Sequence, residues 1–176
     1  MAAPRAGDHG THSVWNVPPA STSQAYGQTS AARQKESESV KYMILLYGSQ
    51  QDYDAMSGQG SERPTWTPQE FAAMGAFMHD FNQRLVDSGE LVETRGLTAP
   101  VHARRIQLRN GVPVVTDGPY AETQEVLAGY WILECESFDR ATEIAAELSK
   151  CPGPGYASES VIDVRPIAES AAELDI

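Results

Sequence analysis

Two short apolar runs constrain the fold of this chain more than any other feature. Residues 42–47 read Tyr-Met-Ile-Leu-Leu-Tyr, and residues 130–133 read Tyr-Trp-Ile-Leu. Each run is far shorter than the roughly 20 apolar residues that cross a bilayer. Neither alternates with polar residues, as a strand with one solvated face does. Both runs therefore indicate β-strands that are buried on both faces of a sheet.

Two segments carry apolar residues at helical spacing behind N-terminal caps. Thr67, Pro68 and Glu70 form a capping box with a first-turn proline, which predicts a helix that ends at Gly89. Ser137 caps a second predicted helix. That second helix runs over about 138–150, further strands are predicted at 91–97 and 160–165, and residues 48–66 are predicted to form a long loop.

The dipeptide Asn-Gly at 110–111 predicts a two-residue hairpin turn between strands 104–109 and 112–117. The register from that turn pairs Arg104 with Asp117 at the far end of the hairpin, on its apolar face. A cross-strand ion pair contributes roughly 0.2–1 kcal/mol when exposed. A register-fixing role and a catalytic role are both open for this pair.

The order of predicted elements is β-α-β-hairpin-β-α-β. It predicts the α+β class, as a ferredoxin-like α/β sandwich with an inserted β-hairpin and with helices on one sheet face. Strands that are apolar on both faces then need a cover on the second face. A second copy of the same sheet is the simplest cover, so we expect a homodimer. The alternative is a monomer in which the 48–66 loop covers that face.

Charge narrows the classes of partner. The chain has 24 acidic and 13 basic residues and a formal net charge of -11. This balance repels phosphate backbones and anionic lipids, so we expect no nucleic-acid partner and no membrane partner. Two cysteines provide no disulfide framework, and residues 1–10 hold no apolar signal region. These features predict a cytoplasmic protein.

The chain divides into three segments by composition. Residues 1–39 carry no net charge and few large apolar side chains, and we expect this extension to be disordered. Residues 40–168 form the predicted domain, followed by an acidic tail at 169–176. Because GTG encodes valine and can also initiate translation in bacteria, we hypothesise that the native chain begins at Val40.

Residues 117–125 read Asp-Gly-Pro-Tyr-Ala-Glu-Thr-Gln-Glu. This segment closely resembles the Asp-Gly-Pro-Phe-Ala-Glu-Thr-Lys-Glu signature of the DGPF family, part of the YCII-related superfamily. The likeness extends over residues 41–166. Tyr120 stands where phenylalanine is usual, and Gln124 stands where lysine is usual. The second difference removes a cation from beside the acidic pair Glu122 and Glu125.

The resemblance implies a dimeric α/β-barrel built from two ferredoxin-like protomers. Some related proteins are dehydrochlorinase-type lyases that act on small aromatic compounds with a His-Asp pair, and some are associated with extracytoplasmic-function sigma factors. Three functions therefore stay open. The chain is a small-molecule-binding or regulatory module, with a sigma factor as one implied partner, or it is such a lyase, or it is a purely structural dimer.

Asp117 is the first candidate for the site, because it has a cationic neighbour and borders the cavity expected between the sheets. His102 is the candidate base, since it precedes the hairpin by two residues, whereas His79 is predicted to face solvent. Trp66 either packs in the core or closes over a small apolar or aromatic ligand. The other candidate ligand contacts are Arg104, Tyr120, Glu122 and Glu125. No motif for a cofactor or a metal is recognised.

Overall fold

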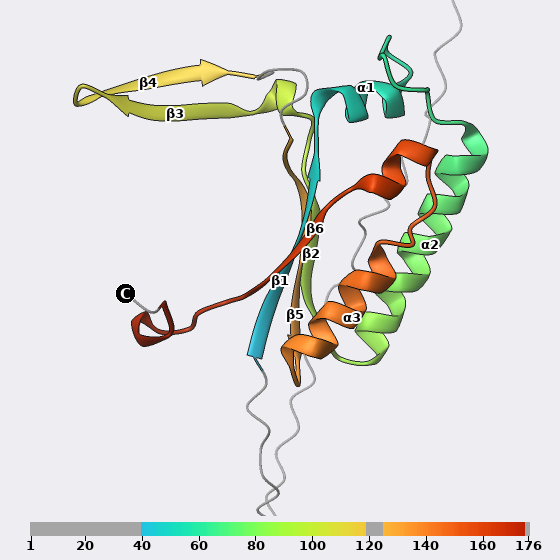
Figure 1. The fold of residues 1–176 in the computed structure, drawn as a ribbon, viewed down its shortest axis with the longest axis vertical. Helices are drawn as coiled ribbons and strands as arrows, with labels where there is room; N and C mark the ends of the chain where they lie inside the picture. Colours follow the sequence, from blue (N-terminus) through green and yellow to red (C-terminus); the bar gives the residue numbers. More distant parts are fainter. Residues whose placement is uncertain (1–39, 119–124, 175–176) are drawn as a thin grey trace, which may run out of the picture.

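The computed structural model describes residues 40–118 and 125–174, except for the side chains of 158 and 159. The predicted extension 1–39 lies outside the described residues, as do Tyr120 and Glu122 of the signature. The described chain forms one antiparallel sheet with helices against one face and a hairpin that projects from the other side (Figure 1). Its class is α+β, as the sequence predicts.

The sheet has four strands in the order β2-β5-β1-β6, and every neighbouring pair is antiparallel. The two apolar runs form its central strands, because β1 and β5 each pair with a strand on both sides. In each run the side chains of one face pack into the core with the helices, and those of the other face lie on the side of the sheet that no described helix covers. The bounds are Val40–Gly48 for β1, Leu91–Gly96 for β2, Val126–Cys135 for β5 and Ile162–Pro166 for β6.

Two long helices cover one face of this sheet, α2 (Pro68–Asp87) and α3 (Phe138–Leu148). The predicted capping box begins α2: the Glu70 carboxylate accepts from the Thr67 N–H at 2.7 Å, and the Thr67 hydroxyl accepts from the Glu70 N–H at 3.2 Å. The Ser137 hydroxyl caps α3 by accepting from a backbone N–H in its first turn. Both predicted helices are confirmed.

The prediction of a long loop at 48–66 is wrong, because residues Gln50–Ser57 form the helix α1. Its start is stabilised by Asp52, whose carboxylate accepts from both the N–H and the hydroxyl of Ser49 at 2.7 Å. The helix is short and mostly polar, and Ala55 is its one buried residue. It therefore lacks the apolar stripe by which the longer helices are predicted.

The core lies between the sheet and the helices α2 and α3. The ring of Trp131 on β5 contacts Phe81 of α2 edge to face, with 6.1 Å between the ring centroids. Its indole N–H donates to the Asn82 side-chain oxygen at 2.9 Å, which satisfies a polar atom in a buried position. The fully buried apolar side chains here include Ile44, Phe81, Trp131, Leu133 and Ile144.

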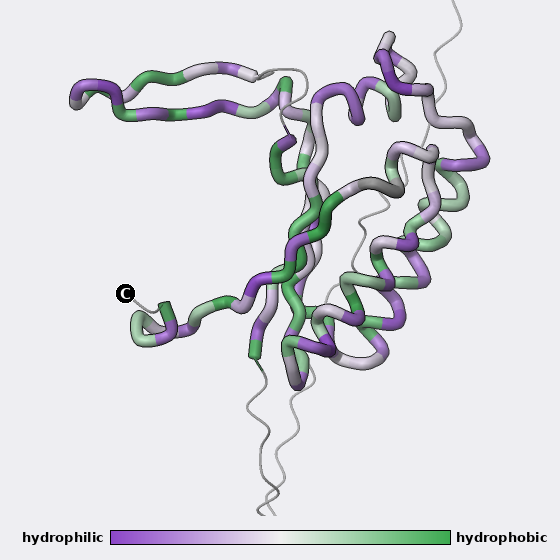
Figure 2. The backbone as a smooth tube through the Cα atoms, in the orientation of Figure 1, coloured by the Kyte–Doolittle hydropathy of each residue, from purple (hydrophilic) through white to green (hydrophobic). Residues whose placement is uncertain are grey.

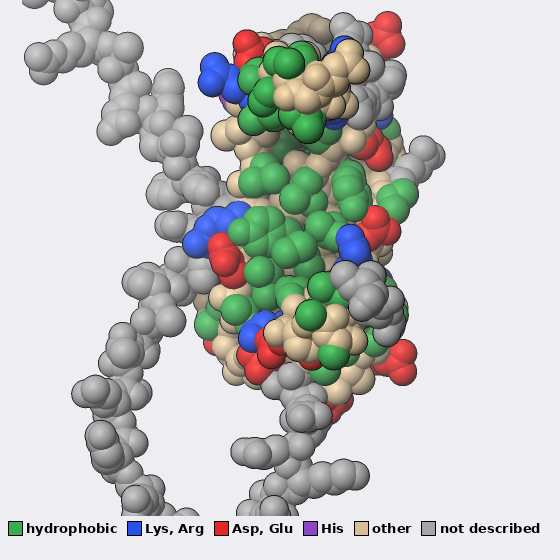
Figure 3. All heavy atoms as spheres, turned by 90° about the vertical axis from the view of Figure 1, so that its left-hand side faces the viewer, with side chains coloured by type: hydrophobic (Ala, Val, Ile, Leu, Met, Phe, Trp, Pro, Cys, Tyr) green, Lys and Arg blue, Asp and Glu red, His purple; other side chains and the backbone are tan. Residues whose placement is uncertain are grey.

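The opposite face of the sheet, which we call the open face, is not covered by any described residue (Figures 1 and 3). Strand alternation assigns Met43, Leu45, Tyr130 and Ile132 to it, since the residues between them pack against the helices. Segment 48–66 lies on the helix side. The alternative in which that segment covers the second face is therefore wrong.

The hairpin consists of β3 (Arg104–Arg109) and β4 (Val112–Asp117), and its predicted register is confirmed. Asn110 and Gly111 have φ of 50° and 78°, which the two-residue turn requires. The hairpin extends beyond the sheet on the side of the open face (Figure 1), and hydrophobic and hydrophilic positions alternate along it (Figure 2). It is a second, two-stranded sheet.

Three 3₁₀ turns complete the described chain, and their bounds are Pro100–His102 for η1, Gly155–Glu159 for η2 and Ala171–Leu174 for η3. The segment that carries η3 leaves the sheet on the same side as the hairpin, but near the opposite end of the sheet (Figure 1). Among the described residues, no helix has the length and apolar character needed to cross a membrane.

Candidate functional site

Three of the predicted site residues meet at the base of the hairpin. His102 ends the turn η1, Arg104 begins β3 and Asp117 ends β4. Together with Val101 and Ala103 they line one open depression. We call this set of residues the hairpin-base cluster. The structure thus brings together an imidazole, a guanidinium and a carboxylate that lie up to fifteen positions apart in the sequence.

The ion pair in this cluster lies at the surface. The Arg104 Nε donates to the Asp117 Oδ1 at 2.9 Å, and both side chains are 74% exposed. At this exposure an ion pair contributes about 0–1 kcal/mol to stability. The carboxylate is therefore available to a bound molecule at little cost to the fold.

Gly118, the second residue of the signature, fixes the end of β4 against η1. Its N–H donates to the Ala103 carbonyl at 2.9 Å. A β-carbon at this position would stand 1.9 Å from the Pro100 carbonyl oxygen. Glycine is needed because two backbone segments approach closely, not because the chain adopts a positive φ. This contact holds His102 and Asp117 in one place.

Helix α1 supports the hairpin-base cluster from the other side. The Gln50 side-chain oxygen accepts from the Val101 N–H at 2.9 Å. The Tyr53 hydroxyl donates to the Leu97 carbonyl at 2.9 Å. The two bonds connect the first turn of α1 to the turn η1 and to the residue that follows β2. The sequence prediction missed this support because it missed the helix.

The other predicted residues that the structure describes are not part of this cluster. Glu125 is exposed and precedes β5 directly. His79 is exposed on α2, as predicted. Trp66 lies between α1 and α2 on the helix side of the sheet, in a different pocket. The structure therefore does not bring Trp66 to Asp117.

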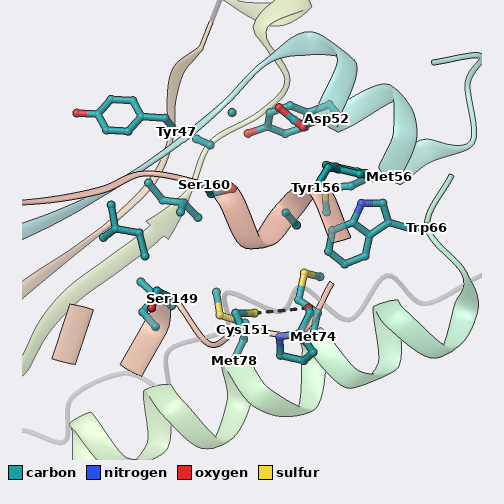
Figure 4. Close-up of a pocket in the computed structure, with 18 of the residues that line it drawn as sticks. Tyr47, Asp52, Met56, Trp66, Met74, Met78, Ser149, Cys151, Tyr156 and Ser160 are labelled. Atoms are coloured by element: carbon teal, nitrogen blue, oxygen red, sulfur yellow. Dashed lines mark hydrogen bonds between the residues drawn. The ribbon is translucent and has the colours of Figure 1, made fainter. Parts of the chain in front are cut away.

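That second pocket, which we call the helix-side pocket, has a volume of about 220 Å³. It lies between the helix-facing side of the sheet, the helices α1 and α2, and the segment 151–160 (Figure 4). Its walls include Leu46, Met56, Trp66, Met74, Met78 and Tyr156. The sequence offered one signal for it, since Met74 and Met78 belong to the apolar stripe of the predicted helix, but that stripe is equally typical of a packed core.

The one charged side chain in the described lining of the helix-side pocket already has a partner. Asp52 forms an ion pair with Arg63, whose guanidinium lies over the Tyr156 ring at 5.0 Å from its centroid. Burial raises the pKa of the Cys151 thiol to about 11, so this group is uncharged at neutral pH. The pocket thus presents a largely neutral, apolar interior.

Comparison with known proteins gives a family but no ligand. A family model described as a YCII-related domain matches residues 40–169. An uncharacterised protein of Rhizobium meliloti (strain 1021) is 29% identical over 130 residues, which cover 72% of this chain and 91% of that protein. In the described part of the chain, no group of His, Cys, Asp or Glu side chains is arranged to hold a metal ion.

Proposed function

The chain belongs to the YCII-related family, and we propose that it works as a homodimeric small-molecule-binding module of the DGPF subfamily. In this proposal the open faces of two copies pack against each other to form a dimeric α/β-barrel. The hairpin-base cluster of each copy lies at the rim of the space between the sheets. A ligand with an apolar or aromatic body would occupy that space.

The observation that carries this proposal is the character of the open face. Apolar side chains gather across it, and charged side chains lie at its two edges (Figure 3). Arg95 lies 3.6 Å from Glu93 on the edge strand β2, and Asp163 and Arg165 face the same side on the edge strand β6. Each edge carries both signs of charge, so two identical faces related by a two-fold axis have charges of opposite sign available to pair across the interface.

Two tyrosines connect the apolar centre with the charged edges. The Tyr130 hydroxyl donates to the Glu93 carboxylate at 3.0 Å, and the Tyr47 hydroxyl donates to the Asp163 carboxylate at 3.0 Å. These hydrogen bonds raise the pKa of both tyrosines, so both stay neutral at physiological pH. Their rings can then line an apolar space while their hydroxyls remain satisfied.

The hairpin supports the same arrangement. Ile106 is 69% exposed and Leu108 is 72% exposed, and they share one face of β3. Large apolar side chains at this exposure on a projecting hairpin are typical of a contact with a partner. The hairpin extends past the open face, so a second copy seated on that face would lie beside it (Figure 1).

The test is the mass in solution of variants that place a charge on the open face. In Leu45→Lys, burial of the ammonium group between two sheets should dissociate the dimer, with the dissociation constant raised at least about 100-fold. Val86→Lys is the matched control, because Val86 is exposed on α2, on the other side of the sheet. Light scattering should show the control as a dimer. A folded Leu45→Lys protein that stays dimeric would contradict the proposed interface.

A proton-transfer enzyme of the dehydrochlorinase type is the second candidate function. It is favoured by one observation, that His102 and Asp117 line the same depression. An enzyme of this kind should eliminate HCl from a chlorinated hydroquinone, which leaves the corresponding quinone, and should lose this activity in both His102→Ala and Asp117→Asn. If the wild-type protein binds a ligand but releases no chloride, the enzyme function is contradicted and the binding function remains.

A further inference from the structure

We propose that the helix-side pocket is a second binding site, for a small uncharged molecule with one aromatic or aliphatic ring. This site lies within one protomer and on the opposite side of the sheet from the proposed dimer interface. It is therefore independent of the homodimer.

The pocket marks the place where close packing between helix and sheet ends. Along α2 the side chains of Leu85, Phe81 and Met78 are buried in the core, whereas Met74, one turn earlier, is only half-buried. Beyond Met78 the space is enclosed by α1 and by segment 151–160, not filled by side chains (Figure 4). A concave and largely apolar space of about 220 Å³ is therefore available to a small ligand at this end of the core.

The volume limits the size of that occupant. A dry apolar cavity of about 150 Å³ holds one benzene molecule. The helix-side pocket, at about 220 Å³, therefore has room for one ring with a small substituent. It is smaller than the roughly 300–1,000 Å³ of sites that hold drug-sized ligands.

The charges around the pocket favour an uncharged occupant. Asp52 is the one charged side chain among the described residues of the lining. One of its carboxylate oxygens accepts from Ser49, and the other pairs with Arg63. With no cation in the described lining, an anionic ligand would lose its hydration without gaining a partner.

The shape of the walls favours a flat or flexible apolar group. Figure 4 shows Met56, Trp66 and Tyr156 on one side of the space, with Met74 and Met78 on the side of α2. Methionine side chains adapt to irregular surfaces and make favourable contacts between sulfur and aromatic rings. An aromatic ring would therefore contact two aromatic side chains and up to three thioethers.

Methionine methyl NMR tests this site in the full-length protein, because four of its five methionines lie in informative positions. Met56, Met74 and Met78 line the pocket, and Met43 lies on the open face. We use p-cresol as the probe, since it is uncharged at pH 7, and 4-methylbenzoate as its anionic analogue. We expect saturable shifts of the three pocket methyl signals, half-complete at about 1 mM or below, and at least about 10-fold weaker binding of the anion.

The methionines whose methyl signals shift show whether the probe binds in the helix-side pocket or in the proposed dimer cavity. A saturable shift at Met43 alone would place the probe on the open face and overturn the pocket proposal, while supporting the proposed function. The absence of a saturable shift at any methionine would overturn the pocket as well. A monomeric protein with shifts at Met56, Met74 and Met78 would keep this proposal and contradict the homodimer.

A variant that fills the pocket adds a second test. Met74→Trp places a larger ring in the space and should weaken p-cresol binding at least about 10-fold, with Met56 and Met78 as the reporters. Val86→Trp is the matched control, because it adds the same ring at an exposed position of the same helix. Unchanged binding in a folded Met74→Trp protein would overturn the proposal. If this variant does not fold, the wild-type methyl shifts decide the question.

Discussion

The Pro100 carbonyl oxygen occupies the space that a side chain on Gly118 would need, since a β-carbon there would lie 1.9 Å from it. This contact joins the turn η1 to the end of β4. It gives the Asp-Gly pair of the signature a structural reason, because the glycine lets the backbone approach η1 and the aspartate beside it then faces the same depression as His102.

Gly118→Ala should therefore displace η1 or the end of β4. We expect a loss of about 1–3 kcal/mol in the free energy of unfolding, as for other substitutions that overfill a packed site. Gly60→Ala is the control, because nothing lies within 4 Å of its added β-carbon and its φ is not positive. Urea denaturation of both variants measures the difference. Equal stability of the two would contradict the close approach of Gly118 to Pro100.

Asp117→Asn should leave the stability of the fold nearly unchanged. Both side chains of its ion pair with Arg104 are exposed, so loss of the pair should lower the free energy of unfolding by less than about 1 kcal/mol. A ligand that contacts this carboxylate should bind more weakly to the variant. Thermal unfolding distinguishes a ligand-binding role of Asp117 from a structural one. A large drop in melting temperature would indicate that Asp117 is a structural residue, as expected for a purely structural dimer.

Acid should weaken a specific contact between α3 and the residue that precedes β2. Arg140 donates to both carboxylate oxygens of Glu90, at 2.7 and 2.9 Å, and this holds the pKa of Glu90 below its ordinary value. A carboxyl group with a lowered folded pKa stabilises the fold above its unfolded pKa and loses this contribution as the pH falls through the folded value. Glu90→Gln should therefore cost about 1–3 kcal/mol at pH 7, and the cost should shrink below about pH 4.

The control for this contact uses the same arginine. Glu143 also pairs with Arg140, at 3.3 Å, but its side chain is largely exposed. Glu143→Gln should change the free energy of unfolding by less than about 0.5 kcal/mol at any pH. Urea denaturation at pH 7 and pH 3.5 compares the two variants. A cost for Glu90→Gln that grows as the pH falls would contradict the assigned direction of the pKa.

Local signals in the sequence account for most of the fold. The capping box at Thr67 and the Asn-Gly turn depend on interactions between near neighbours, the two apolar runs are patterns of consecutive residues, and each predicted its element correctly. Helix α1 was missed although Ser49 and Asp52 form a local cap, because no apolar stripe follows that cap and the helix is also held by distant contacts such as the bond from Val101 to Gln50. A short polar helix of this kind has no periodic signal.

The candidate site was predictable only in part, for the same reason. The hairpin register brought Arg104 and Asp117 together, and the position of His102 in the sequence placed it near them. The placement of Trp66 depends on α1 and on packing against Gly153, where an added β-carbon would lie 3.0 Å from the indole ring. Such contacts between distant segments leave no pattern in one sequence, so the helix-side pocket could not be predicted.

Isotope-filtered NMR can detect directly whether the open faces of two copies meet in solution. Full-length chains with ¹³C-labelled methionine methyl groups are mixed with unlabelled chains, and intermolecular nuclear Overhauser effects are recorded. The proposed homodimer should give such effects at Met43, which lies on the open face, and none at Met56, Met74 or Met78, which line the pocket on the other side. Intermolecular effects confined to the pocket methionines, or none at any methionine, would contradict it.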